Sequence, residues 1–258
     1  MRQTHLRTKL PETGRRRGVV RVAGSLVLRQ LGIALVAVTA YAQAPPLSSP
    51  RELLEIDPRG FAHWLQSNRP TPVSPDQKAR TLASLPRQGE ITDLDAASRR
   101  KLASLGPVLR ANGHELAYHI KVIDVPQVRI GLYARTVVLI SEAALTLLEP
   151  EELQAHVAHE IGHDYVWVDH AHATARRDSR RLKDLELLCD AIAIVTVHGL
   201  GMDPSRLMTG VEKVMRNNRL IYESSVDESN YPTLSERRKF ARAVTAWVAG
   251  ASPPRSAQ

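Results

Sequence analysis

The chain has 258 residues, with 35 Lys and Arg against 27 Asp and Glu, a formal net charge of +8 and a single cysteine. One cysteine, Cys189, excludes an intrachain disulfide, and its position excludes a lipobox near the N-terminus. Residues 1–42 hold eight basic residues and one acidic residue, so the remainder carries a net charge of about +1. Since that remainder has no basic excess and the chain is only 4% aromatic, we expect no nucleic-acid partner.

Residues 1–42 have the pattern of a secretory signal peptide. A basic segment is followed by an apolar run over residues 31–40 and by the small residues Ala40 and Ala42. The apolar run is short for a membrane span, so we expect no stable span once the leader is removed. The predicted product is a soluble, exported, periplasmic protein. Arg16 and Arg17 leave the twin-arginine route open beside the general one, and a membrane-anchored protein that keeps the segment is the alternative.

The rest of the chain is predicted to form one α+β domain, mainly helical, with a small β-sheet. Eight of the sixteen prolines fall between positions 45 and 86, so residues 43–90 are predicted to be a proline-rich arm of loops and short helices. Residues 91–249 form the domain, and residues 250–258 are expected to be a disordered tail. The pattern predicts a helix over 93–110, broken at Gly106-Pro107, and then three β-rich segments at 116–125, 128–133 and 136–140.

Residues 159–163 read His-Glu-Ile-Gly-His, and this pentapeptide carries the strongest chemical signal in the chain. In a helix, residues four apart lie one turn apart on the same face, so His159 and His163 can direct ring nitrogens at one metal ion. Glu160 then flanks that ion. We therefore interpret His159 and His163 as metal ligands and Glu160 as a catalytic base.

The flanking residues support a helix over this motif. Pro150 suits the first helical position, and neighbouring glutamates place negative charge at the positive end of the helix dipole. An apolar stripe roughly opposite the histidines is formed by Leu153, Val157 and Ile161. A stripe of small residues, which would let a second helix approach closely, is formed by Ala155, Ala158 and Gly162.

Residues 181–198 are the candidate for that second helix, and Gly199 suits a left-handed C-terminal cap. The segment is apolar on nearly every side after Leu187, yet it carries Glu186 and Asp190 four residues apart. Buried carboxylates without partners are costly, and a metal ion and a ligand histidine would be such partners. We expect Glu186 to be the third ligand and Asp190 to orient a ligand imidazole through its other ring nitrogen. The alternative is that both carboxylates lie on an exposed edge.

Two imidazoles and one carboxylate are a typical ligand set for catalytic zinc, with the fourth position left for water. Zinc lowers the pKa of that water to about 7, and a glutamate beside it can accept the proton. The predicted cofactor is one Zn²⁺ per chain. The predicted chemistry is metal-dependent hydrolysis with Glu160 as general base.

Three further histidines lie close to the motif in the sequence. His156 precedes His159 by nearly one turn, but a fourth protein ligand would close the position that hydrolysis needs, so we interpret it as a neighbour. His170 and His172 fall in the polar segment 169–180, which we expect to be a solvated loop that joins the two helices.

The two motifs together resemble a known family. Residues 159–163 are followed, 23 residues after His163, by Glu-Leu-Leu-Cys-Asp at 186–190. This spacing is similar to the HEXXH plus E-x-x-A-D pattern of the HtpX and CAAX-prenyl endopeptidases, which are zinc metallopeptidases of the gluzincin type. The resemblance extends over residues 91–242. It implies a zincin-like metallopeptidase domain with the ligand, base and supporting roles given above. The chain has Cys189 where that family usually has alanine, a modest change in volume.

The resemblance also implies catalytic roles for Tyr231 and Arg237. The family often carries a His-Pro pair with an arginine several residues later, and this chain has Tyr231-Pro232 and then Arg237. A phenol can donate a hydrogen bond to the oxyanion of a tetrahedral intermediate, and the arginine would be a positive neighbour. The alternative is that Tyr231-Pro232 is only a turn before a helix over residues 234–248.

In peptidases that resemble this chain, an edge strand beside the zinc binds the substrate as an added strand through main-chain hydrogen bonds. The candidate strand covers residues 128–133, with Val128, Ile130 and Leu132 as the pairing residues. By the same analogy, the expected substrates are unfolded or misassembled proteins of the cell envelope. The alternative function is a chaperone-like binding factor that keeps the metal fold and cleaves little.

Overall fold

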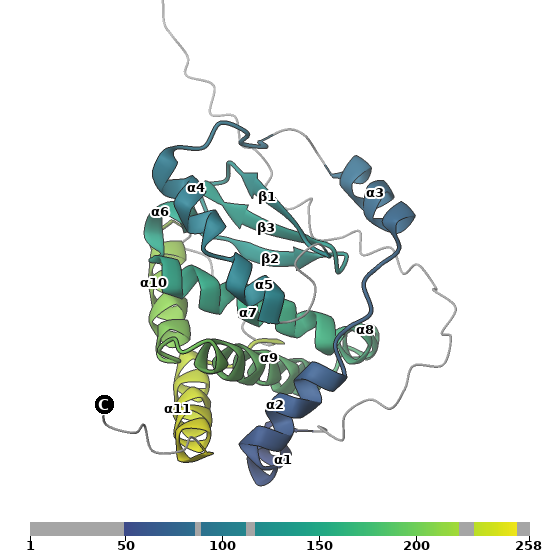
Figure 1. Ribbon diagram of the computed structural model, residues 1–258, viewed down its shortest axis with the longest axis vertical. Helices are drawn as coiled ribbons and strands as arrows, with labels where there is room; N and C mark the ends of the chain where they lie inside the picture. Colours follow the sequence, from purple (N-terminus) through teal and green to yellow (C-terminus); the bar gives the residue numbers. More distant parts are fainter. Residues whose placement is uncertain (1–48, 86–88, 112–116, 222–229, 252–258) are drawn as a thin grey trace, which may run out of the picture. The chain divides into compact units, whose positions relative to one another are not determined.

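The computed structural model describes residues 49–85, 89–111, 117–221 and 230–251. The predicted signal peptide (1–42) and residues 252–258 of the predicted tail lie outside the described residues. The described residues are mostly helical and include a three-stranded sheet, so the α+β prediction is confirmed at that level (Figure 1). No helix among the described residues combines the length and the apolar character needed to cross a membrane.

The sheet consists of β1 (His119–Ile123), β2 (Ile130–Tyr133) and β3 (Val137–Ser141), in the order β1-β3-β2. β1 runs parallel to β3, and β2 runs antiparallel to it. A tight turn joins β2 to β3, with positive φ angles of 47° at Ala134 and 59° at Arg135. Two such residues in succession match the right-handed twist of a hairpin. Because the strand order is β1-β3-β2, β2 is an edge strand of the sheet. It begins at Ile130, two residues later than the predicted segment.

The predicted helix over residues 93–110 is two helices, α4 (Ala96–Ala103) and α5 (Gly106–Ala111). The predicted break is present, because α5 starts at the glycine. Asp95 caps α4 by accepting a hydrogen bond from the backbone N–H of Ser98 at 2.6 Å. After the sheet, α6 (Glu142–Leu147) begins in the same way, with the Ser141 hydroxyl accepting from the N–H of Ala144 at 3.1 Å.

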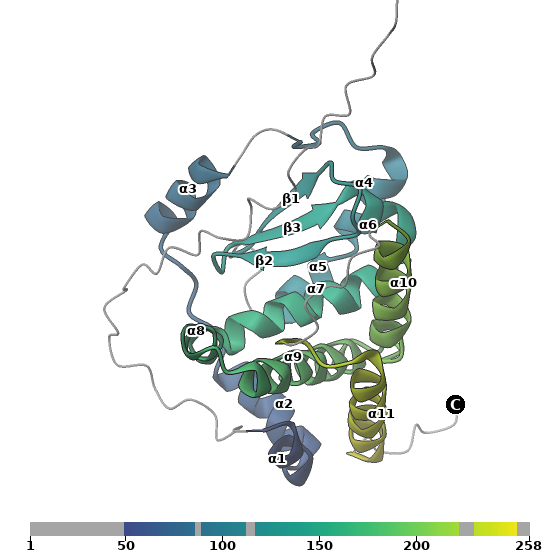
Figure 2. The same ribbon diagram turned by 180° about the vertical axis from the view of Figure 1, so that it is seen from behind.

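The motif histidines lie on α7 (Pro150–Tyr165), which starts at Pro150 as predicted. A capping box between Glu149 and Glu152 secures this end. α7 contacts β2 and also packs on α9 (Ser179–Gly199), the second predicted helix (Figures 1 and 2). α7 and α9 approach closely at Gly162, where an added Cβ would lie 3.0 Å from the Cα of Cys189. The small residue therefore allows the two site helices to meet.

Two predictions about the chain around these helices are wrong. The polar segment 169–180 is mostly helical, since α8 (Trp167–Arg176) occupies it and ends at Arg177 with φ 56°. Its charged residues form the solvated side of an amphipathic helix, with Ala173 buried on the other side. Gly199 is the last residue of α9 and has no positive φ; Gly201, with φ 75°, takes the left-handed conformation instead.

Two more helices complete the domain. α10 (Arg206–Ile221) packs on α7, and the Lys213 ammonium lies 2.8 Å from the buried Glu152 carboxylate. α11 (Leu234–Ala251) packs on α9 and covers the predicted helix over 234–248. Thr233 and Glu236 exchange hydrogen bonds at its start, as a capping box does.

The predicted arm contains short helices, each starting at a proline: α1 (Pro50–Glu55), α2 (Pro58–Ser67) and α3 (Pro75–Ser84). α1 and α2 contact α9 and α11 and contribute the buried residues Leu53, Phe61 and Leu65. The Trp247 indole N–H, on α11, donates to the Ile56 carbonyl at 2.9 Å. Residues 50–67 thus belong to the same core as the site helices, whereas α3 has no buried residue.

Candidate metal centre

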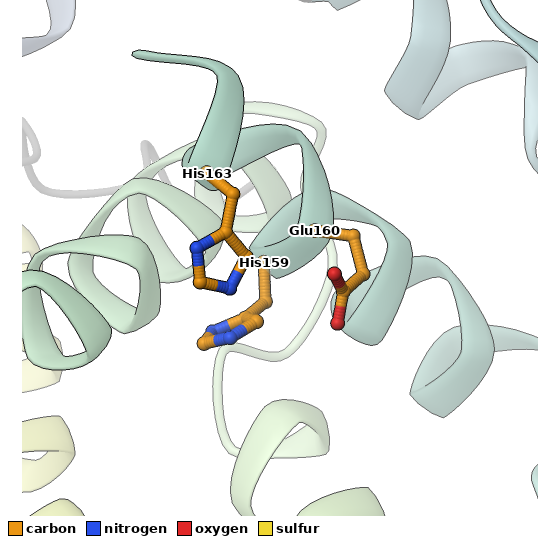
Figure 3. A group of neighbouring side chains, drawn as sticks. All are labelled: His159, Glu160 and His163. Atoms are coloured by element: carbon orange, nitrogen blue, oxygen red, sulfur yellow. The ribbon is translucent and has the colours of Figure 1, made fainter. Parts of the chain in front are cut away.

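The two motif imidazoles project from one face of α7, one turn apart, and Glu160 lies beside them (Figure 3). The ring centroids of His159 and His163 are 5.1 Å apart and the rings are nearly perpendicular. His159 is buried and His163 is partly buried. The i, i+4 spacing therefore brings both rings to one point.

Glu186 reaches the same point from α9. Its Oε2 lies 3.5 Å from His159 Nε2, and its Oε1 lies 3.7 Å from His163 Nε2. Ligand atoms around a tetrahedral ion with bonds of about 2.1 Å are roughly 3.4 Å apart. The distances from the Glu186 oxygens to the two imidazoles are thus close to the separation between two ligands of one metal ion.

The charges at this point are unequal. Burial lowers the pKa of His163 to about 4, so this imidazole is neutral and has a lone pair for a metal. Burial also acts to lower the pKa of His159, but the carboxylates of Asp190 and Glu186 accept hydrogen bonds from its ring and raise the pKa to about 10. Without a metal, His159 is therefore protonated at neutral pH. A metal ion that binds there must displace one proton.

Asp190 contacts the ring nitrogen of His159 that points away from Glu186. Its Oδ1 lies 2.8 Å from His159 Nδ1, and this contact leaves Nε2 to face Glu186. Burial acts to raise the pKa of Asp190, but the Arg237 guanidinium and His159 hold that pKa well below its usual range. The structure therefore places Asp190 where the orienting acid was predicted.

Arg237, in the first turn of α11, binds the same carboxylate. Its Nε donates to Asp190 Oδ2 at 2.8 Å, and a second guanidinium nitrogen donates to Oδ1. The described donors of Arg237 bind Asp190, and its charge also acts to lower the pKa of Glu186 and of Glu160, as that of a positive neighbour does. Arg237 is a positioning residue that acts through Asp190 on His159.

Glu160 is held by the edge strand. Its Oε2 accepts a hydrogen bond from the Leu132 N–H at 3.0 Å. Burial raises the pKa of Glu160 to about 7, so near neutral pH the carboxyl group exchanges a proton readily. His159, Glu160 and His163 each offer a ligand atom within 4.8 Å of one another, and this group could hold a metal ion.

Comparison with known proteins assigns no family to this chain. No family model matches it, and no curated protein matches it. The chemistry of the centre is therefore inferred from its own residues. Imidazole nitrogens and carboxylate oxygens that converge from two packed helices are suitable donors for a divalent transition metal.

The predicted pairing residues of the edge strand have different surroundings. Ile130 and Leu132 lie in β2, and Leu132 contacts the site through Glu160. Val128 lies before β2, and the Asn218 side chain binds both its N–H and its carbonyl, each at 3.0 Å. Val128 is therefore corrected as a free pairing residue, because its main chain already has partners.

Tyr231 lies in the short irregular segment that precedes α11. The tyrosine is also close to the site. Partial burial, together with the Glu186 and Glu160 carboxylates, raises its pKa, and half of the residue remains exposed. The phenol is thus a neutral hydrogen-bond donor at the margin of the carboxylate cluster.

His170 is the residue that sequence reasoning missed. On α8, its ring packs edge-on to His163 with centroids 5.8 Å apart, and it forms a second possible metal-holding group with His163 and Glu186. No local spacing indicated this contact, because His163 lies on α7 and His170 on α8, and the break between the two helices brings the rings together. His172 is exposed. His156 faces α10 instead, where an added Cβ on Gly210 would lie 2.8 Å from its ring.

Proposed function

We propose that this protein is a zinc-dependent endopeptidase with a zincin-like fold. The observation that carries the proposal is the convergence of the His159 and His163 Nε2 atoms on the two oxygens of Glu186, 3.5 and 3.7 Å away. Two imidazoles and one carboxylate suit zinc and leave one coordination position for a reactant. The resemblance of the two motifs to HtpX and CAAX-prenyl endopeptidases supports the same proposal.

The donor set fits a bound zinc ion in charge as well as in distance. His163 is already neutral, and Glu186 keeps its negative charge because burial raises its pKa less than the hydrogen bond from His159 and the neighbouring positive charges lower it. Zinc held by these residues would act as a Lewis acid and make a water molecule nucleophilic at neutral pH. Asp190 and Arg237 would keep His159 oriented toward the ion.

Glu160 would move the proton in this reaction. Its pKa of about 7 lets it accept a proton from the attacking water and return it to the leaving amine, since a catalytic group works best when its pKa is near the working pH. To do this the carboxylate must share its Leu132 hydrogen bond with the reactants. Tyr231 would donate its phenolic proton in a hydrogen bond to the oxyanion that forms at the substrate carbonyl.

The substrate would be an extended segment of an unfolded protein. An edge strand beside the reacting groups supplies main-chain hydrogen bonds, which make few demands on side chains. β2 is such an edge, and its Leu132 N–H reaches Glu160. With the predicted signal peptide, this supports a role in the removal of misassembled proteins in the cell envelope.

Cleavage of casein by the zinc-loaded protein tests the proposal. Glu160→Gln should keep the metal, measured by mass spectrometry of bound zinc, and lower the rate about 10²-fold or more. Glu151→Gln, on the exposed side of the same helix, is the control and should retain the rate. If wild type and Glu160→Gln both held zinc and were equally inert, the peptidase would be refuted, and the chaperone-like binding function would be tested by suppression of aggregation.

A further inference from the structure

Along β2 and the residues just before it, every second residue forms main-chain hydrogen bonds with β3. The residues between them turn their main-chain groups outward. Arg129 faces β3, since its carbonyl accepts from the Ser141 N–H at 2.8 Å. In an antiparallel ladder, alternate residues turn their main-chain groups away from the partner strand. The Leu132 N–H turns away in this manner, because it donates to Glu160. Val128, Ile130 and Leu132 therefore turn their main-chain groups toward the outer edge of β2, where an added strand would lie.

Asn218 already occupies one position of this edge. Its Oδ1 accepts from the Val128 N–H and its Nδ2 donates to the Val128 carbonyl, both at 3.0 Å. In antiparallel pairing, one residue of a partner strand exchanges these same two hydrogen bonds with the residue opposite it. The Asn218 amide thus stands where one residue of an incoming strand would lie.

The position of Asn218 is well anchored. It lies on α10, which Lys213 joins to the buried Glu152 of α7 at 2.8 Å. Close packing of His156 on Gly210 brings the same helix against α7. Val128 itself is only 3% exposed. An incoming peptide would have to break two partly buried hydrogen bonds to pair there.

Ile130 lies between these two occupied positions. Leu132 on one side contacts Glu160, and Val128 on the other contacts Asn218. Within the described residues, no hydrogen bond joins the Ile130 main chain to a group outside the sheet. Ile130 is therefore the position where a substrate can form both strand hydrogen bonds without displacing a protein group.

We infer that Asn218 is a specificity-determining residue that ends the substrate-binding edge at Val128. The inference rests on the proposed peptidase function. A substrate antiparallel to β2 runs from Leu132 toward Val128, so its residues nearest Asn218 lie on the C-terminal side of those near Glu160. Asn218 limits how many residues on that side contribute to binding, and it directs longer chains off the edge after Ile130.

A length series of fluorogenic peptides tests this inference. Each peptide contains one bond found to be cleaved in casein and carries one to six residues on its C-terminal side. With the zinc-loaded wild type, kcat/KM should rise with the first residues and then become constant. With Asn218→Ala, kcat/KM should continue to rise, by roughly two- to tenfold for each additional main-chain hydrogen bond. Asn217→Ala, the adjacent asparagine on α10, is the matched control and should follow wild type.

The outcomes separate the two proposals. If Asn218→Ala and wild type showed the same dependence on length, the inference would be overturned while the peptidase function stood. If wild type cleaved none of these peptides, nor casein, both would fail. Circular dichroism of Asn218→Ala checks that the variant is folded.

If Asn218→Ala does not fold, the inference can be tested on protein that keeps Asn218. In zinc-loaded Glu160→Gln protein, ¹⁵N NMR should show the Asn218 side-chain amide unchanged when the longest peptide is added, while the Ile130 amide signal shifts. If the Asn218 signal moved to the position of a free amide as the peptide bound, the peptide would have displaced it and the inference would be wrong.

Discussion

The two sides of the metal centre are built differently, although both ligand histidines lie on the same helix one turn apart. His159 is held by Asp190 at 2.8 Å, and Arg237 holds Asp190 in turn. At His163, the Cys189 thiol lies 3.5 Å from Nδ1 and the His170 ring packs edge-on against the imidazole. The charged side consists of the chain His159, Asp190 and Arg237. The packed side consists of His163 and the closely packed α9 beside it. Orientation of one imidazole is therefore electrostatic, whereas that of the other depends on how closely two helices meet.

The largest effect is expected from breaking the charged side. Asp190→Ala leaves the Arg237 guanidinium buried without its partner, and such a loss costs about 3–5 kcal/mol of unfolding free energy. It also frees His159 to rotate, which should weaken zinc binding about 10- to 100-fold. Urea denaturation and chelator competition measure the two quantities. Asp184→Ala, a partly buried acid on the same helix, is the control. Equal effects of the two variants would contradict the special role of Asp190.

The next effect concerns the proton on His159. Its pKa is raised to about 10, above the ordinary 6.5, so the protonated form is the stable one at neutral pH in the metal-free protein. A metal and this proton compete for Nε2, so zinc affinity should rise with pH, about tenfold per unit between pH 7 and 9. Calorimetry in buffers of different ionisation enthalpy should detect release of about one proton.

Asp190→Asn supplies the control for this titration. The amide carries no charge to hold the proton on His159, so the pKa of His159 should fall and the pH dependence above pH 7 should flatten. A wild-type affinity that does not change between pH 7 and 9 would show that His159 is neutral before the metal binds.

The packed side is broken by Gly162→Ala. The new Cβ would lie 3.0 Å from Cys189 Cα and 3.3 Å from its carbonyl, and backbone atoms cannot move away as a flexible side chain can. We expect a loss of about 1–3 kcal/mol of unfolding free energy, as for other overpacked sites. Gly199→Ala on α9, where an added Cβ meets nothing, should instead gain up to about 1 kcal/mol from helix propensity. Similar unfolding free energies for both variants would refute the close contact.

This contrast also explains which parts of the site could be predicted from the sequence. The i, i+4 spacing of His159 and His163 defines their common face once a helix is assumed. Glu186 and Asp190 were identified because two carboxylates in an apolar helix need buried partners. Local spacing and burial therefore indicated the residues that the structure brings together, together with the α+β class.

The remaining features depend on contacts between segments that no local pattern connects. The Asn218 amide meets Val128 across 90 positions in the chain, and Arg237 meets Asp190 across 47. His170 was interpreted as a loop residue because the charges around it suggested a solvated loop, whereas they form the outer side of α8. Gly199 was expected to take the left-handed conformation at the end of α9, whereas Gly201 takes it.

The smallest effect is expected from Cys189→Ala. The thiol is fully buried and its pKa is raised well above the usual value, so it is a neutral, weak partner for the His163 ring. Its removal leaves a small cavity that should cost about 1 kcal/mol, with zinc affinity changed by less than about threefold. Chelator competition on Cys189→Ala beside Asp190→Ala compares the two sides directly. A loss of zinc affinity as large as that of Asp190→Ala would mean that the thiol orients His163 as firmly as the carboxylate orients His159, and that packing alone does not hold this ligand.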